Sequence, residues 1–414
     1  MKTITTLTAR EILDSRGTPT IEVTCTLSSG AIGIASVPSG ASTGIHEALE
    51  LRDGEQSRYN GLGVQQAVAH VVGEISTLCS GHEYSQQSLD DALIALDGTP
   101  NKSRLGANAI LGVSMSFAVA AARDSHMPLY QYLKEVSATD MVVVPRPMFN
   151  VINGGKHADS GLDIQEYMIV PIGFDSITRA VQAGAEVISA LKKLLHEQGY
   201  STSVGDEGGF APKLASNEEA LELLVHAIDR AGYTTEQIKI ALDVAASSFY
   251  TDGVYVLTAG GRQERKTAQD MIAWYERLLE TYPIISIEDG LTEDDWEGFQ
   301  AMTTAVGTRA HIVGDDLTVT NVSRIEKAVA GHAINAVLIK LNQIGTVSET
   351  IAAIALTKAQ GWAPIVSHRS GETTDTFIAD LAVGCACPFI KSGSLVRGER
   401  VCKYNRLMDI EREL

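Results

Sequence analysis

The sequence is short of basic residues and of cysteine, and it has no apolar run long enough to cross a membrane. Lysine and arginine number 33 against 51 aspartate and glutamate residues, which gives a formal net charge of −18. Nucleic acids and anionic membranes attract basic surfaces, so this charge disfavours both as general partners. It does not exclude a small anionic substrate, because a few basic groups can line a pocket. The most apolar stretch, residues 109–122, is about 14 residues long, whereas a membrane span needs about 20, so we expect a buried helix there.

The five cysteines form no metal-binding or redox pattern. Cys385 and Cys387 are separated by one residue, which is not the CxxC spacing, and no histidine cluster completes a zinc site. The first residues, MKTITTLTAREILD, contain no apolar signal core. We therefore expect a cytoplasmic protein whose cysteines stay reduced.

The chain is too long for one small core, and its pattern changes partway along. The first 40 residues alternate as in a β meander, and three predicted helices follow, at 64–79, 85–96 and 106–124. The segment VVVPRPM, residues 142–148, holds two prolines and marks a boundary. We expect a smaller α+β domain over residues 1–137 and a second domain over residues 138–414.

In the second domain, short apolar runs alternate with amphipathic helices, and successive runs end on an ionisable residue. These run ends are Asp243, Glu288, Asp315, Lys340, His368 and Lys391. The last four intervals are 27, 25, 28 and 23 residues, close to the about 25–30 residues of one βα unit. The first interval, of 45 residues, has room for an extra hairpin at 248–261.

This repeat predicts an α/β fold in which a closed (β/α)₈ TIM-like barrel follows the α+β domain. A barrel gathers its strand ends at one mouth, where barrel enzymes carry their active sites. An open doubly wound sheet is the alternative, but it would spread six reactive strand ends along an edge. The chain also has no GxGxxG motif after a strand.

Three of the run ends are carboxylates, namely Asp243, Glu288 and Asp315. Hard oxygen ligands of this kind suit Mg²⁺, and unpaired charges in an apolar mouth would be costly without a cation. The alternative is that each acid caps the helix that follows it. Lys340 and Lys391 have two interpretations. Either could be a base whose pKa burial and a neighbouring cation lower, or a fixed cation that binds phosphate or carboxylate.

Other segments add polar groups to the predicted mouth. SHRSGE contributes His368, Arg369 and Ser370, and the arginine fork matches phosphate. VGDEGGF places Glu207 between glycines. VPSGASTG, residues 37–44, lacks the GK[ST] ending of a P-loop and is interpreted as a lid over the barrel, with an ordinary Ser/Gly turn as the alternative. Residues 153–171 add His157, Gln165 and Glu166.

In order along the chain, DSRGTPTIEV, VPSGASTG, GDEGGFAP, SIEDGL, IKLNQIGT and SHRSGETTDTFIADLAVG resemble the enolase family, from about residue 8 to the C-terminus. The resemblance implies a carbon–oxygen lyase of glycolysis, phosphopyruvate hydratase. It would dehydrate 2-phospho-D-glycerate reversibly to phosphoenolpyruvate with two Mg²⁺ ions per site, the second bound only with substrate. It also implies a homodimer, since Arg10 and Glu399 match positions that pair across the family's dimer interface.

The resemblance assigns roles by position. Asp243, Glu288 and Asp315 match the ligands of the tightly held Mg²⁺, and Ser42 matches a lid serine that helps to hold the second. Lys340 matches the general base that takes the C2 proton. Glu207 matches the general acid for the 3-hydroxyl, and Glu166 assists it. The substrate-contacting positions are His157, Gln165, His368, Arg369, Ser370 and Lys391.

Three positions depart from the family's usual residues, which are proline at Gly290 and glutamate at Thr374 and Ser248. Gly290 and Thr374 leave open a specialised paralogue that acts on a related phosphate or phosphonate. A non-catalytic binding protein on the same scaffold is a second alternative, because a fold does not fix a function. Within IISIEDGLTEDDW we expect Asp289 to point away from the mouth toward a structural partner. In the same stretch we expect Thr292 to cap the next helix.

Overall fold

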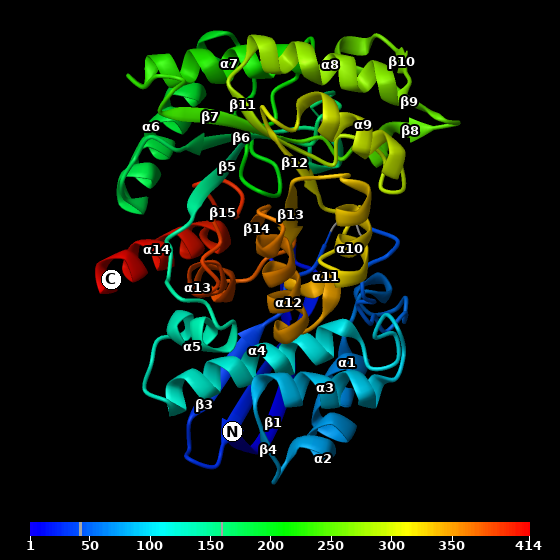
Figure 1. Cartoon of the computed structure of the whole chain (residues 1–414), viewed down its shortest axis with the longest axis vertical. Coiled ribbons are helices and arrows are strands. Elements are labelled where there is room, and N and C mark those ends of the chain that lie inside the picture. Colours follow the sequence, from blue (N-terminus) through cyan, green and yellow to red (C-terminus); the bar gives the residue numbers. More distant parts are fainter. Residues whose placement is uncertain (41–43, 159) are drawn as a thin grey trace.

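A computed structural model describes residues 1–40, 44–158 and 160–414 of the chain. It has two parts, a smaller N-terminal part and a barrel. Figure 1 shows the N-terminal part at the bottom and the barrel above it. In the described residues, no helix is long and apolar enough to span a membrane.

The N-terminal part is a four-stranded antiparallel sheet, in the order β3-β2-β1-β4, with helices packed against it. The predicted alternation in TIEVTCTL is confirmed, since Ile21, Val23 and Cys25 are buried while the residues between them are half-buried. The strands are β1 (Lys2–Leu13), β2 (Pro19–Leu27), β3 (Ile32–Ser36) and β4 (Glu83–Tyr84). The helices are α1 (Gln65–His70), α2 (Ser76–Cys79), α3 (Gln86–Asp97), α4 (Ala107–Asp124) and α5 (Leu129–Val136).

Helix α4 is the apolar segment that the sequence predicted to be a buried helix, and it lies directly on strands β2 and β3. Its small side chains let the two backbones touch. A Cβ added at Gly33 of β3 would lie 2.0 Å from the carbonyl oxygen of Ser116 and 2.3 Å from the backbone nitrogen of Ala120. Gly33 is therefore required by close packing between sheet and helix.

Eight strands close the barrel in the order β5-β6-β7-β11-β12-β13-β14-β15. The bounds are β5 (Arg146–Asn153), β6 (Glu166–Pro171), β7 (Ile238–Asp243), β11 (Ile284–Glu288), β12 (His311–Gly314), β13 (Ala336–Ile339), β14 (Ala363–Ser367) and β15 (Phe389–Lys391). The surrounding helices are α6 (Ile177–Glu197), α7 (Asn217–Arg230), α8 (Ala268–Thr281), α9 (Trp296–Val306), α10 (Val322–Gly331), α11 (Leu341–Ile344), α12 (Val347–Ala359), α13 (Phe377–Gly384) and α14 (Gly398–Glu413). The predicted α/β barrel is confirmed.

One strand departs from a regular (β/α)₈ repeat. Strand β6 runs antiparallel to both of its neighbours, β5 and β7, while the other neighbouring pairs are parallel. Its first residue, Glu166, therefore pairs with Asp243, the last residue of β7, and reaches the same mouth. Each of the six predicted run ends lies at this mouth, as the last residue of its strand or the next one: Asp243, Glu288, Asp315, Lys340, His368 and Lys391.

The 45-residue interval does contain the predicted extra hairpin, as β8 (Tyr250–Thr251) and β9 (Val254–Leu257). A third strand beyond the predicted range, β10 (Glu264–Lys266), pairs with β9. The predicted cap of α9 is wrong. The carboxylate of Asp295 accepts the backbone N–H of Gly298 at 2.9 Å and caps the helix, whereas the backbone N–H of Thr292 donates to the Tyr255 hydroxyl at 3.0 Å. The hairpin thus holds Thr292 outside the helix, and α9 begins later than expected.

The N-terminal part caps a barrel helix. The first backbone N–H groups of α12 have no partner within the helix. Those of Val347 and Ser348 donate to the Ser114 hydroxyl at 3.0 Å and to the Asp90 carboxylate at 2.9 Å. Burial raises the pKa of Asp90 to about 6, although hydrogen bonds from Ser114, Ser348 and Gln86 oppose the shift. The two parts are therefore joined by buried hydrogen bonds as well as by apolar packing.

Replacing Gly33 should test the contact between β3 and α4. Gly33→Val should lower the free energy of unfolding by about 1–3 kcal/mol or more, because the new side chain overlaps backbone atoms of α4. Gly73→Ala is the matched control, since an added Cβ there meets no atom within 4 Å. Urea denaturation measures both, and a Gly33→Val midpoint equal to that of the wild type would contradict this packing.

Candidate active site

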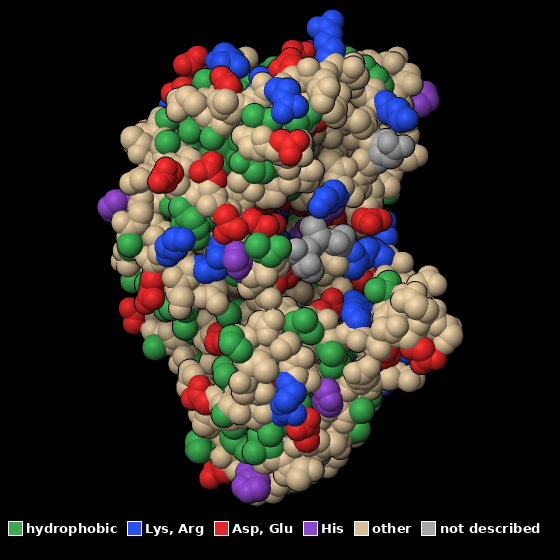
Figure 2. All heavy atoms as spheres, turned by 90° about the vertical axis from the view of Figure 1, so that its right-hand side faces the viewer, with side chains coloured by type: hydrophobic (Ala, Val, Ile, Leu, Met, Phe, Trp, Pro, Cys, Tyr) green, Lys and Arg blue, Asp and Glu red, His purple; other side chains and the backbone are tan. Residues whose placement is uncertain are grey.

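A cleft at the barrel mouth collects most of the residues that the sequence singled out. Figure 2 shows basic and acidic side chains gathered on the face where the two parts of the molecule meet. The predicted residues that line the cleft are His157, Gln165, Glu166, Glu207, Asp243, Asp315, Lys340, His368, Arg369, Ser370 and Lys391. Glu288 is 1% exposed and reaches this group by contacting Lys391. Ser42 lies outside the described residues.

Lys391 is the centre of an acidic cluster. Its Nζ lies 2.8 Å from the carboxylate of Glu288, 3.3 Å from that of Asp243 and 3.6 Å from that of Glu166. Burial alone would lower the pKa of Lys391, but these carboxylates raise it well above its usual value. These contacts favour the interpretation of Lys391 as a fixed cation, and its role stays a prediction.

Lys340 belongs to the same cluster, and its Nζ donates to Oδ2 of Asp315 at 2.5 Å. Burial again lowers its pKa, but Asp315 outweighs burial and the net shift is upward. Both interpretations of Lys340, as a base and as a fixed cation, stay predictions. The other carboxylate oxygen of Asp315 accepts a hydrogen bond from Gln343 Nε2 at 2.8 Å.

The charges of this cluster do not balance. Four buried carboxylates, those of Glu166, Asp243, Glu288 and Asp315, contact only two lysines within the group. Burial raises the pKa of Glu288 well above its usual value, and repulsion from Asp243 adds to that rise. Buried charge of one sign is costly unless a counter-charge compensates it. The donor set of carboxylate oxygens therefore fits a hard divalent cation.

Asp289 forms a second acidic group with Asp315 and Asp316, whose ligand atoms lie within 4.8 Å of one another. Both oxygens of Asp289 accept backbone N–H groups at 2.9 Å, from Asp315 and from Asp316. Its backbone has a left-handed φ of 42°. Because its oxygens are already engaged, we assign Asp289 to holding Asp315 in place, as the expected structural partner suggests. Asp289 nevertheless lines the cleft, so the expectation that it points away from the mouth is wrong.

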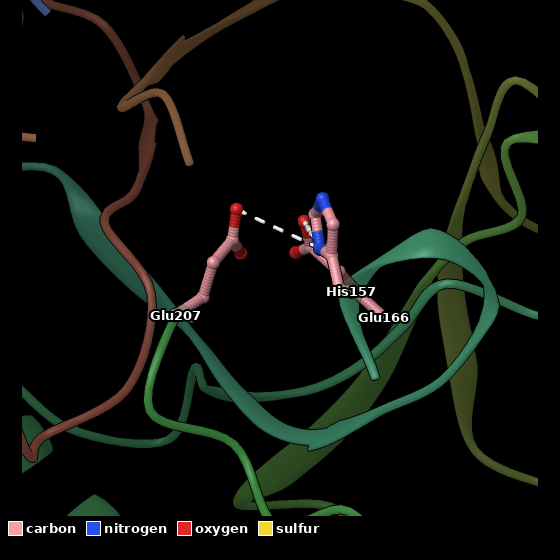
Figure 3. A group of neighbouring side chains, drawn as sticks. All are labelled: His157, Glu166 and Glu207. Atoms are coloured by element: carbon pink, nitrogen blue, oxygen red, sulfur yellow. Dashed lines mark ion pairs between the residues drawn. The ribbon is translucent and has the colours of Figure 1, made fainter. Parts of the chain in front are cut away.

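A further group combines His157, Glu166 and Glu207, whose side chains approach one another in Figure 3. Nδ1 of His157 lies 3.7 Å from a carboxylate oxygen of each glutamate. On its other side, Glu207 lies 3.3 Å from Nε2 of His368. Burial raises the pKa of Glu166, and the charge of Glu207 adds to that rise. Burial would raise the pKa of Glu207 too, but His368 and His157 hold it well below its usual value.

Sequence reasoning missed Arg400, which lies in α14 and is completely buried. Its guanidinium donates to Nδ1 of His368 at 2.6 Å and to the carbonyl oxygens of Arg369 and Ser370, each at 2.6 Å. It also donates to the carbonyl oxygen of Asp206, next to Glu207, at 3.1 Å. An arginine in a polar C-terminal helix is ordinarily solvent-exposed, so no signal in the sequence marked it.

The two residues expected at a dimer interface have partners within this chain. Arg10, whose side chain is 72% exposed, pairs with Glu22 at 2.7 Å. Glu399 pairs with Arg397 at 3.0 Å and with Arg400 at 3.3 Å. The homodimer stays a prediction from the resemblance.

Two family models together cover almost the whole chain. The model described as the enolase N-terminal domain matches residues 4–133, and that described as the enolase C-terminal TIM barrel domain matches residues 141–414. The chain belongs to the enolase family. This membership indicates a lyase-type enzyme with a small phosphorylated substrate, and the acidic clusters at the mouth could hold the metal that enolases typically need. The expected domain boundary, between residues 137 and 138, stays a prediction.

The departures from the usual enolase sequence leave the cleft intact. Ser248 and Thr374 are exposed. The carbonyl oxygen of Gly290 accepts the Tyr275 hydroxyl at 2.7 Å, and a Cβ added at Gly290 would lie 2.9 Å from the Met302 methyl carbon. Met302 thus fills the space beside Gly290, so that a proline ring there would have to displace it.

Replacing Arg400 should test its role in holding the mouth. Arg400→Met should lower the free energy of unfolding by about 3 kcal/mol or more, because the buried carbonyl groups of the 369–370 turn lose their donors. Arg412→Met in the same helix is the control, since its pair with Asp409 is exposed and should contribute less than about 1 kcal/mol. Equal urea midpoints for the two variants would contradict the assignment.

Proposed function

We propose that this enolase catalyses the Mg²⁺-dependent, reversible dehydration of 2-phospho-D-glycerate to phosphoenolpyruvate and water. One observation carries the proposal. A single cleft brings together the lysine pair of Lys340 and Lys391, the carboxylates around them, and the pair of Glu166 and Glu207. A lysine base, a carboxylate-held cation and a carboxylic acid are the groups that removal of an α-proton and a β-hydroxyl requires. Enzymes of the enolase superfamily are known to use a lysine or histidine base with one or two Mg²⁺ ions, so this part of the proposal is inherited from the family.

Asp243, Glu288 and Asp315 would hold Mg²⁺, which supplies positive charge for the substrate carboxylate when bound. Lys340 is assigned the removal of the C2 proton. That step places a second negative charge on the substrate carboxylate, and the fixed cation Lys391 would stabilise it. The second Mg²⁺ and its ligand Ser42 stay predictions.

Hydroxide is a poor leaving group and needs a proton. Glu207 is assigned the delivery of that proton, and Glu166, whose pKa is raised, holds the proton within the pair. Arg369 and Ser370 would bind the phosphate, while His157 and Gln165 contact the substrate. His368 lies between Glu207 and Arg400, so it orients the acid in addition to any contact with substrate.

Neither alternative gains support from a particular feature of the cleft. A changed substrate would require changed residues near it, but Ser248, Gly290 and Thr374 are not among the described residues that line the cleft. A non-catalytic role would not require a buried lysine beside an acid pair.

Purified protein with Mg²⁺ and 2-phosphoglycerate should show rising ultraviolet absorbance as phosphoenolpyruvate forms. Chelation of the metal should abolish the rise, and added Mg²⁺ should restore it. Lys340→Ala should lower kcat by about 10²–10⁴-fold, because the base is lost. The variant also loses the contact with Asp315, so circular dichroism checks that it still folds. Lys192→Ala, at an exposed position of α6, should keep full activity.

Wild-type protein that forms no phosphoenolpyruvate would contradict the proposed function. An active Lys340→Ala variant would contradict the assignment of the base alone.

A further inference from the structure

An ion pair that crosses between the two parts of the molecule reaches into the cleft. Glu47, which lies between the predicted lid and β4, contacts Arg369, which follows β14. Nη1 and Nη2 of Arg369 donate to the two carboxylate oxygens of Glu47 at 2.9 and 3.2 Å. The side chains of Arg369 and Glu47 are only 4% and 6% exposed, so this pair is not a solvated surface contact.

Further contacts fix both ends of the pair. Nη1 of Arg369 also donates to Oδ1 of Asn342 at 3.0 Å. A carboxylate oxygen of Glu47 accepts the backbone N–H of Gly44 at 3.1 Å and lies 3.4 Å from Nε2 of Gln343. The backbone N–H of Ala48 donates to the carbonyl oxygen of Gln343 at 2.8 Å. The segment that carries Glu47 is therefore attached to α11.

The same contacts lead to the acidic cluster. Nε2 of Gln343 donates to Asp315 at 2.8 Å, so one amide group lies between Glu47 and a proposed metal ligand. Glu47 is therefore connected to two groups of the proposed site. It contacts Arg369, which is assigned to phosphate, and it reaches Asp315, a proposed metal ligand, through Gln343. None of the sequence patterns singled out this residue.

A two-point contact with a carboxylate fixes the plane of a guanidinium, which is otherwise carried on a long flexible side chain. Arginine binds phosphate well when this fork is already oriented, because less conformational freedom is then lost on binding. Removing the carboxylate would take away the two-point contact that fixes this buried guanidinium and would let the fork turn toward its other acceptors.

We propose that Glu47 is a positioning residue that holds Arg369 in the orientation that receives the phosphate group of the substrate. The inference rests on the proposed function, because that function assigns phosphate to Arg369. Among the described residues, Glu47 makes no direct hydrogen bond or ion pair with Lys340 or Glu207, which are assigned the chemistry. Its loss should therefore affect binding more than turnover.

Glu47→Gln keeps the size of the side chain and removes its charge. We expect the KM for 2-phosphoglycerate to rise at least about tenfold, with kcat changed by less than about threefold, since misorientation of a binding group weakens the complex. Glu74→Gln is the control. Glu74 lies in the same N-terminal part, but it pairs with Arg104 at 2.9 Å in an exposed contact, and its replacement should leave KM unchanged. An unchanged or lowered KM in Glu47→Gln would overturn the proposal.

A double-mutant cycle separates positioning from general support of the fold. If Glu47 acts through Arg369, then adding Glu47→Gln to Arg369→Met should leave KM within about twofold of Arg369→Met alone. A merely structural role would make the two effects add, which would overturn the proposal.

Calorimetric titration of the full chain with inorganic phosphate tests the role of Glu47 without relying on turnover. Its outcome is therefore independent of the activity assay that tests the proposed function. Wild-type protein should bind phosphate, and Glu47→Gln should bind it at least about tenfold more weakly. If the wild type turned over no 2-phosphoglycerate, the proposed function would fail while this comparison still decided the role of Glu47. Equal affinity in the two proteins, including no binding by either, would contradict the proposal.

Discussion

The arrangement of the mouth depends on the contact between Lys391 and three buried carboxylates. Charges buried in a protein are tolerated only when opposite charges lie close by. Lys391 supplies one such charge to Glu166, Asp243 and Glu288, and Lys340 supplies another to Asp315. The cluster still has more carboxylates than lysines. This excess of buried negative charge destabilises the fold, and it also allows the site to accept a divalent cation.

The barrel explains why these groups meet. A closed sheet brings the ends of distant strands to one mouth, so residues far apart in sequence become neighbours. Strand β6 contributes by running in the opposite direction, which brings its first residue, Glu166, to the mouth where the other strands end. The N-terminal part completes the site from outside. Ser39 and Gly371 exchange two backbone hydrogen bonds of 2.8 Å beside Arg369, and Glu47 reaches the guanidinium itself.

Much of this organisation follows from local sequence pattern. The spacing of the ionisable run ends predicted the barrel, because most intervals between successive ends equal the length of one βα unit. Alternation predicted the strands of the N-terminal sheet, and the apolar run at 109–122 predicted the interior of α4. Family resemblance then supplied roles that spacing alone left open, such as that of Lys340.

The features that the sequence did not reveal depend on tertiary contacts. The direction of β6 is set by pairing with its neighbours. Arg400 and Glu47 are charged residues of ordinary appearance, and only the folded chain shows that they are buried beside Arg369. The upward pKa shift of Lys340 likewise comes from Asp315, whose distance the sequence does not contain.

Calorimetric titration with Mg²⁺ tests most directly whether the excess carboxylates form a metal site. Wild-type protein should bind Mg²⁺ without substrate, and Asp243→Asn should weaken that binding by at least about tenfold, because one hard ligand and one negative charge are lost. Asp409→Asn, at an exposed position of α14, should bind like the wild type. Equal Mg²⁺ affinity in Asp243→Asn and the wild type would contradict the account.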